Sequence, residues 1–243
     1  MIVAAALCPW PPLLVRELTG ADPVLPELRA ACDAAVAAVL AAGPGVVVVA
    51  GPGPATERLP ADGRLDVAAF GGLPGPSAAA ARPALPPAPG IGAYLLDRAG
   101  YAGRRVIWSV SEDEPPGKCA RLGADLAGTA ERTGLLVLGD GSARRGPKAP
   151  GHFDERAAAF DAAVEEAVRA GDLGALLDID PALARDLMAT GRPAWQLLAG
   201  ALRAGARPEG AGGGPAAPAV DVQYAGDPFG VKYLVASLIP SLS

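Results

Sequence analysis

The sequence predicts an α/β fold in which a central mixed sheet lies between helices, a three-layer sandwich formed by a single domain over residues 1–243. Two observations support this prediction. Uniformly apolar runs of strand length, such as 2–7 and 46–50, alternate with helix-length segments, and such runs are typical of strands buried on both faces. The Gly- and Ala-rich segment 206–218 leaves too little chain after it for a second domain.

Strands and helices alternate in the first half of the chain. In order, the pattern predicts a strand at 2–7, a helix over 21–43, a strand at 46–50, a loop over 51–64, a strand at 65–70 and a long Gly-, Pro- and Ala-rich loop over 71–90. The helix carries signals at both ends, because Asp22 fits an N-cap, Pro23 fits the first turn and Gly43 fits the C-terminal cap.

The second half continues the alternation. In order, the pattern predicts a helix at 91–100, a strand at 104–110, a helix at 117–134, a strand that runs into a Gly-rich turn at 135–143, an amphipathic helix at 154–172, a helix that starts at Asp180 and Pro181, a helix at 194–205, a strand at 219–226, and a strand or helix at 230–240. Trp108 and Trp195 lie in apolar segments and are expected in the core.

Composition restricts the partners and the location of the protein. The net charge is −5 and no long basic run is present, which argues against nucleic acid as a partner. Residues 34–56 are uncharged over membrane-spanning length, but Gly43–Pro44–Gly45 interrupts them, so we expect a helix, a turn and a buried strand and no membrane partner. Three widely spaced cysteines without a CxxC pair, and no basic N-terminal region, predict a cytoplasmic protein with reduced thiols. The sequence is compatible with a small-molecule ligand and with a homo-oligomer.

Three turns follow predicted strands, at 8–12, 50–54 and 139–146, and could share the sheet edge where ligands gather in α/β folds. The candidate residues for a cleft there are Cys8, Trp10, Pro52, Asp140, Ser142, Arg144, Arg145 and His152. The turn at 139–146 could bind an anion through its backbone N–H groups and arginines; the alternative is a tight loop with solvated arginines.

Several candidates have a structural alternative. His152, the lone histidine, could serve a triad, yet no GxSxG elbow is present and a loop histidine is usually at the surface. Cys8 could be a reactive thiol, although a buried structural cysteine is the commoner case. Asp178 and Asp180 could be paired catalytic carboxylates, although their place before a helix favours capping.

Five segments occur in an order that resembles the LigB-like family of class III extradiol ring-cleavage dioxygenases, in a divergent branch of bacterial proteins. They are AALCPWPPLLVREL, VVVVAGPGPAT, LLVLGDGSARRGPKAPGHFDERAAAFD, DPALARDLMATGRPAWQLLAGA and YAGDPFGVKYLVA. The resemblance spans the whole chain, and its strongest part is the strand followed by GDGSARRGPKAPG. It implies an extradiol dioxygenase-like fold.

The resemblance also implies an iron site, which this chain departs from. Ring-cleaving members hold Fe(II) with two histidines and a carboxylate, and a further histidine acts as acid and base. Trp10 stands where the first ligand would lie in an HPPLL turn, and Ala50–Gly51–Pro52 stand where the second would follow its strand. Ala143 stands at the acid/base position of a GD-x-S-H motif. Indole N–H is only a donor, so Trp10 cannot replace a histidine ligand.

These departures leave three hypotheses. The first is a pseudoenzyme, or a ligand- or partner-binding module, with no cofactor, no metal ligands and no assigned catalytic residue. The second is a metal-dependent oxidoreductase, an aromatic ring-cleaving dioxygenase whose Fe(II) is held by substituted ligands such as Cys8, Glu57, Asp140 and His152. The third is a metal-free reaction in the same cleft that uses Cys8 or Asp140.

Overall fold

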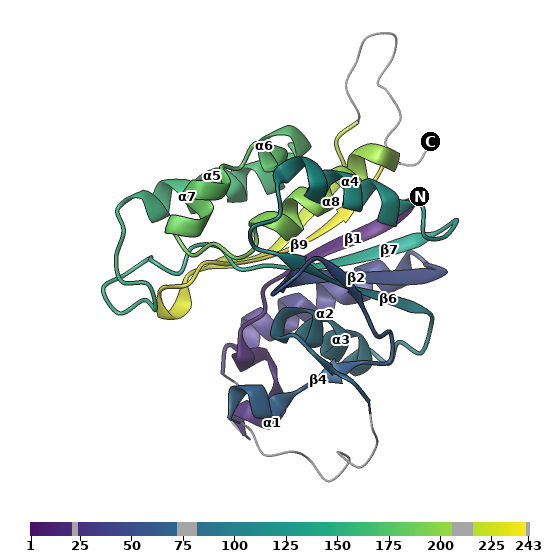
Figure 1. Ribbon diagram of the computed structural model, residues 1–243, viewed down its shortest axis with the longest axis horizontal. Coiled ribbons are helices and arrows are strands. Elements are labelled where there is room, and N and C mark those ends of the chain that lie inside the picture. The colour runs from purple at the N-terminus through teal and green to yellow at the C-terminus, as the bar shows by residue number, and fades with distance from the viewer. Residues whose placement is uncertain (21–23, 72–81, 206–215, 242–243) are drawn as a thin grey trace.

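The protein is described by a computed structural model that places residues 1–20, 24–71, 82–205 and 216–241. Its central feature is a seven-stranded sheet in the order β3–β6–β2–β7–β1–β9–β8 (Figure 1). The inner strands β6 (Arg105–Ser111), β2 (Val46–Gly53), β7 (Thr133–Leu138) and β1 (Ile2–Cys8) run parallel. Antiparallel pairings add β3 (Glu57–Leu59) to β6, β9 (Tyr233–Ile239) to β1 and β8 (Ala219–Gly226) to β9, so the sheet is mixed.

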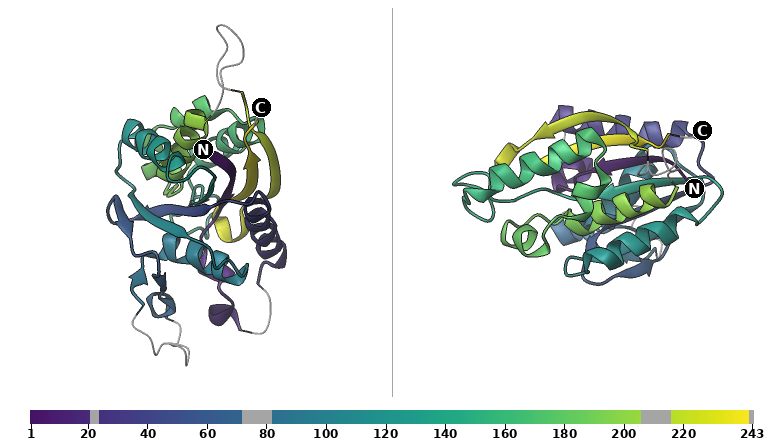
Figure 2. Two further views of the ribbon diagram at one scale, coloured as in Figure 1. Left: turned by 90° about the vertical axis from the view of Figure 1, so that its right-hand side faces the viewer. Right: turned by 90° about the horizontal axis from the view of Figure 1, so that it is seen from above.

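Helices cover both faces of this sheet and complete the three layers, as predicted (Figures 1 and 2). One face carries α2 (Pro26–Ala41) and α3 (Pro87–Arg98). The other carries α4 (Pro116–Ala127), α5 (Arg156–Ala170), α6 (Leu173–Leu177), α7 (Pro181–Asp186) and α8 (Arg192–Gly205). Shorter elements are α1 (Arg16–Thr19), the paired strands β4 (Arg64–Leu65) and β5 (Ala84–Leu85), and the 3-10 turns η1 (Pro12–Leu14), η2 (Val67–Phe70) and η3 (Pro228–Gly230).

Strand β2 shows why the inner strands are apolar at every position. Val46, Val48 and Ala50 belong to the core beneath α4 and α8, whereas Val47 and Val49 belong to the core beneath α2 and α3. Alternate side chains of a strand point to opposite faces, so a strand covered on both faces has no polar side.

Helices α4 and α8 pack backbone to backbone on their face of the sheet. A Cβ atom added to Gly123 would lie 2.0 Å from the Leu197 carbonyl oxygen, and one added to Gly200 would lie 2.2 Å from the Ala120 carbonyl oxygen. The two backbones can therefore approach this closely only because glycine occupies both positions.

The structure confirms several end signals. Asp180 caps α7, since its Oδ1 accepts a hydrogen bond from the Ala182 N–H at 2.9 Å, and Gly43 follows α2 with φ +62°. The segment 230–240, for which the sequence allowed a strand or a helix, contains a strand, β9. Trp195 is 1% exposed, as expected, whereas Trp108 is half-buried.

Other boundaries were predicted wrongly. The strand expected at 65–70 is mostly the 3-10 turn η2, and the loop expected over 51–64 contains the edge strand β3. Helix α3 begins within the expected loop 71–90, because proline is tolerated in the first turn of a helix. The helix expected to reach 134 ends at Ala127, since Thr133 already starts a central strand.

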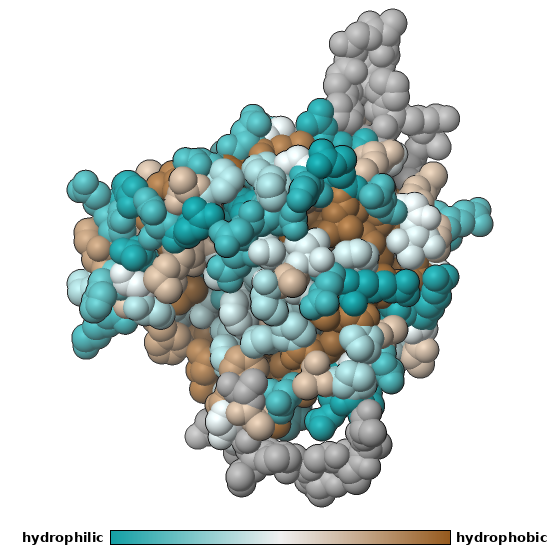
Figure 3. Space-filling model, viewed as in Figure 1, coloured by the Kyte–Doolittle hydropathy of each residue, from teal (hydrophilic) through white to brown (hydrophobic). Residues whose placement is uncertain are grey.

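The predicted cap residues 22 and 23 and most of the segment 206–218 lie outside the described residues. Helix α2 itself begins at Pro26. The uncharged stretch 34–56 forms the end of α2 and then β2, and no helix in the described part of the chain has the length and hydrophobicity to cross a membrane. Hydrophilic side chains cover much of the face seen in Figure 3, with apolar side chains exposed between them.

Candidate functional site

The three predicted turns meet at one edge of the sheet. Strands β2, β7 and β1 are neighbours and run parallel, with Cys8 paired to Leu138 and Ala50 to Val137. Their carboxyl ends therefore lie at the same edge of the sheet. We call the turns at 8–12, 50–54 and 139–146 on this edge the strand-end site. This arrangement confirms the prediction that the turns lie together.

Trp10 ties the turn after β1 to two other loops. Prolines occupy positions 9, 11 and 12, so the Trp10 N–H is the one backbone donor among residues 9–12. It donates to Asp140 Oδ1 at 2.9 Å, and the indole Nε1 donates to Thr190 Oγ1 at 3.2 Å. The half-buried indole is thereby held in one orientation at the strand ends.

Asp140 lies two residues beyond β7, at the strand-end site. Burial raises its pKa from 3.8 to about 7, and the hydrogen bond from the Trp10 N–H opposes only part of that rise. Its backbone carbonyl accepts a hydrogen bond from the Gly191 N–H at 2.9 Å. A carboxyl group that titrates near neutral pH can both take and give a proton.

Ser142 and Arg145 belong to a different network, which anchors the turn to α5. Asp161 accepts hydrogen bonds from the Ser142 N–H at 2.8 Å and from Ser142 Oγ at 2.7 Å. Arg145 lies 3.6 Å from the same carboxylate and 3.0 Å from Asp227. Burial raises the pKa of Asp161, which is 3% exposed, against the lowering effect of Ser142. The network is structural, because its charges and donors are satisfied inside the protein.

The anion-binding interpretation of the turn at 139–146 is not supported, and its alternative, a tight loop, fits the hydrogen bonds of the structure. Four backbone N–H groups of the turn donate to carbonyl oxygens elsewhere in the chain: Gly139 to Cys8, Gly141 to Lys232, Ala143 to Leu187 and Arg145 to Gly230. With the Ser142 N–H bound to Asp161 as well, these donors do not point at a ligand.

The remaining candidates do not gather around one cleft. Cys8 is 0% exposed and packs in the apolar core beneath α2, so it is placed as a structural cysteine. Pro52 is buried on β2. Arg144 is half-buried, with its Nε lacking a hydrogen-bond partner among the described residues. His152 is exposed, in a turn with φ +58°.

A cavity of about 430 Å³ lies beside the strand-end site and shares Thr190 with it. Its lining mixes charged, polar and apolar side chains: Glu112, Asp113, Arg185, Met188, Thr190 and Arg192. Arg185 on α7 and Asp113, beyond β6, form an ion pair at 2.6 Å. Burial and the neighbouring Asp113 raise the pKa of Glu112.

Arg192 and Gln196 on α8 hold the loops on both sides of this cavity. The buried Arg192 guanidinium donates to the carbonyl oxygens of Glu112 and Glu114, and to Gln196 Oε1 at 3.0 Å. Gln196 Nε2 in turn donates to the carbonyl oxygens of Leu177 and Ile179, both at 3.0 Å. One helix thus fixes the loop after β6 and the loop before α7.

The sequence analysis named none of the residues that line this cavity as a candidate, and it also missed Asp161. Thr190 stands between two helices, inside the segment DPALARDLMATGRPAWQLLAGA that carries part of the resemblance, but nothing in that segment marked the threonine as a site residue. Asp161 did carry a signal: it falls among the buried positions of α5, next to Phe160 and one turn before Val164. A carboxylate at a buried helical position indicates a specific hydrogen-bond or ion-pair partner within the protein.

Comparison with known proteins establishes a shared fold and no family. No family model matches the chain, and neither does any curated protein. The crystal structure of uncharacterized protein JW3007 from Escherichia coli K12 is similar to it, with a TM-score of 0.52 and 14% sequence identity over 98% of this chain and 99% of that one. At this identity the likeness concerns the fold alone.

The positions that the resemblance assigns to iron do not fit a metal ion. The Trp10 indole has no lone pair to offer, and its N–H is engaged by Thr190. Gly51, Pro52 and Ala143 have no ligating side-chain atoms. The described residues also contain no group of three or more His, Cys, Asp or Glu side chains that could hold a metal ion. The substituted ligand set of Cys8, Glu57, Asp140 and His152 is therefore not assembled.

Proposed function

We propose that the protein is a small-molecule-binding member of the extradiol dioxygenase-like fold family that works without Fe(II). The observation that carries the proposal is the pair of hydrogen bonds made by Trp10, one to Asp140 and one to Thr190. They hold an indole at the position that the sequence resemblance assigns to the first iron ligand. A tryptophan held in this way fills the space around it and contributes apolar burial.

The cavity beside Thr190 supports the binding role. Its volume of about 430 Å³ falls within the usual range for small-molecule sites, roughly 300–1,000 Å³. Carboxylates of Glu112 and Asp113 face the same space as the guanidinium of Arg185. Asp113 and Arg185 already compensate each other in their ion pair, whereas Glu112 forms no ion pair within the described part of the chain. The lining therefore suits a small polar molecule that carries an amine or several hydroxyl groups.

A second candidate is metal-free proton transfer at the strand-end site. It is favoured by one observation, the pKa of Asp140 raised by burial to about 7. A general acid or base works best when its pKa lies near the working pH. In this mechanism Asp140 would move the proton, and Trp10 would position its carboxylate through the 2.9 Å hydrogen bond.

The first experiment measures iron. Protein without a histidine tag is exposed to Fe(II) under anaerobic conditions, desalted and analysed for metal by mass spectrometry, beside Trp10→His and a matched Trp10→Phe control. We expect iron at background in the wild-type protein and in Trp10→Phe. Iron near one equivalent in the wild-type protein, together with cleavage of catechols, would overturn the proposal in favour of a substituted-ligand dioxygenase.

The second experiment looks for the ligand. Amino acids, hydroxy acids and catechols are tested for a rise in melting temperature, and each hit is repeated with Glu112→Gln and with Glu131→Gln as an exposed control outside the cavity. A ligand of the cavity should lose its effect in the first variant and keep it in the second. A hit that both variants retain binds elsewhere.

A further inference from the structure

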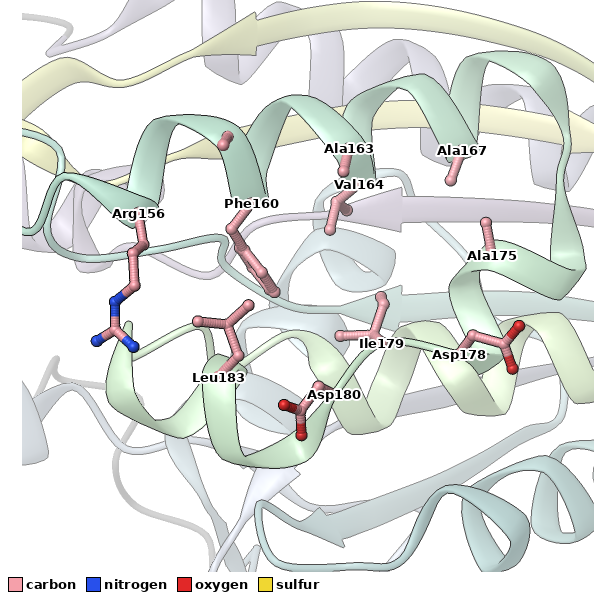
Figure 4. A pocket seen from close by; sticks show the side chains of 11 residues that line it. Arg156, Phe160, Ala163, Val164, Ala167, Ala175, Asp178, Ile179, Asp180 and Leu183 are labelled. Atoms are coloured by element: carbon pink, nitrogen blue, oxygen red, sulfur yellow. The ribbon is translucent and has the colours of Figure 1, made fainter.

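A second hollow, the α5–α7 groove, lies between α5 on one side and α6 and α7 on the other (Figure 4). Its volume is about 560 Å³, and it shares no lining residue with the cavity beside Thr190. Helix α7 separates the two, since Leu183 faces the groove and Ala184 and Arg185 face the cavity. The groove is therefore a separate feature from the site proposed above.

The floor of the groove is apolar. Phe160 and Val164 point from α5 toward Ile179 and Leu183 on the opposite wall (Figure 4). Phe160 is 8% exposed and Val164 is 6% exposed, because they also pack into the core. Ala163 lines the wall of α5 and is solvent-exposed, and its small side chain leaves the groove open. An apolar molecule can thus lie along α5 against a rigid surface.

The positive charge at one end of the groove is already compensated. Arg156 lies 2.8 Å from Asp154 and 3.3 Å from Asp186. The Arg156 guanidinium holds the pKa of Asp154 at about 2, so that carboxylate stays ionised at neutral pH. An anionic group would meet two carboxylates beside this arginine, and this end of the groove does not attract anions.

The rim of the groove between α6 and α7 carries two carboxylates that have no ion-pair partner among the described residues. Asp178 and Asp180 both line the groove, and neither forms an ion pair within the described part of the chain. Asp180 Oδ1 accepts the capping hydrogen bond from Ala182, which leaves its negative charge in place. Around an apolar floor, the rim therefore has a negative potential that favours a cation.

We propose that the α5–α7 groove binds an amphiphile with an apolar body and one positive charge, such as an alkylamine. The apolar body lies over Phe160, Val164, Ile179 and Leu183, and the ammonium group lies at the rim formed by Asp178 and Asp180. Charge complementarity selects this occupant over a fatty acid, which would place a carboxylate against the same rim. The volume of about 560 Å³ suits a ligand of this size.

The test compares two amphiphiles with similar apolar chains and opposite charge, decylammonium and decanoate. Their binding to the 243-residue chain is measured by isothermal titration calorimetry below their micelle concentrations. We expect decylammonium to bind with one-to-one stoichiometry and about threefold to fivefold more tightly than decanoate, as expected for one favourable ion contact at an exposed site. Asp178→Asn should reduce this preference, whereas Asp125→Asn, at an exposed carboxylate on α4, should leave it unchanged.

Adjacent alanines on α5 give a matched pair of blocking variants. Ala163 lines the groove and Ala162 does not, although both are exposed. Ala163→Phe should weaken decylammonium binding by about tenfold or more, because the ring occupies the ligand's space, and Ala162→Phe should not. Circular dichroism and the urea midpoint confirm that each variant is folded.

Three results would overturn the proposal. They are no binding of decylammonium, equal binding of both amphiphiles, and binding that Ala163→Phe leaves unchanged. Sedimentation analysis adds a fourth: a dimer that Ala163→Phe abolishes and decylammonium does not disturb would assign the groove to a second copy of the chain.

Discussion

Asp140→Asn tests whether the strand-end site favours the protonated, neutral form of the Asp140 carboxyl group. In the folded protein the pKa of Asp140 lies at about 7, compared with 3.8 for the free group. Between these pH values the folded protein binds a proton that the unfolded chain releases. The resulting stabilisation is fully present below pH 3.8 and is lost as the pH rises through about 7.

The size of the effect follows from the shift in pKa. At about 1.4 kcal/mol for each pH unit, the rise from 3.8 to about 7 corresponds to about 4 kcal/mol. The side chain is partly exposed, and solvent screening reduces the expected value to about 2–4 kcal/mol. Asparagine keeps an oxygen that can accept the Trp10 N–H, so the variant removes the ionisation while the hydrogen bond can persist.

The assay is urea unfolding of the wild-type protein and Asp140→Asn at pH 4.5 and pH 8, with Asp125→Asn as a surface control. We expect Asp140→Asn to be more stable than the wild-type protein at pH 8 and to lose this advantage at pH 4.5. A stability difference that does not depend on pH, or a variant less stable at pH 8, would refute the reasoning.

Further predictions concern packing, the loop network and the thiols. Gly123→Ala should destabilise the protein by about 2 kcal/mol, since overpacking costs up to about 3 kcal/mol and the higher helix propensity of alanine offsets about 1 kcal/mol of that cost. Gly117→Ala, at an exposed position of the same helix, should not destabilise the protein. Equal stability of the two variants in urea would contradict the close contact between α4 and α8. Ser142→Ala should cost about 1–3 kcal/mol by leaving Asp161 without its hydroxyl partner, whereas an unchanged urea midpoint would show that the network contributes nothing. All three cysteines are buried, so a thiol reagent should label them only after unfolding, and rapid labelling of the native protein would be inconsistent with the fold.

The layers of the fold could be predicted from the sequence because the inner strands are apolar at every position. Strands at 2–7 and 46–50 were found on this basis, and helices with a proline and an aspartate at their start, such as α7, were found from their caps. Elements without such signals were missed. The edge strand β3 has exposed and half-buried side chains, and the prolines of 83–90 hid the start of α3.

The site could be predicted only as a location. The turn motifs placed Trp10 and Asp140 at one sheet edge, but hydrogen bonds such as that from Trp10 to Thr190 span 180 positions and depend on the packing of α8. The same limit left the anion-binding interpretation of the turn at 139–146 open, since a glycine-rich turn does not reveal whether its N–H groups are bound by distant carbonyl oxygens. In this turn they are taken, by residues such as Leu187 and Gly230.

The way α8 holds the loops around the cavity has a consequence for how the protein can evolve. Arg192 and Gln196 bind those loops through main-chain oxygens, which every amino acid supplies. Replacing Glu112 and Asp113 therefore removes only the exposed ion pair of Asp113 with Arg185 and leaves these main-chain hydrogen bonds to the loop in place. A library randomised at these two acidic positions should therefore consist largely of folded proteins that differ in the lining of the cavity.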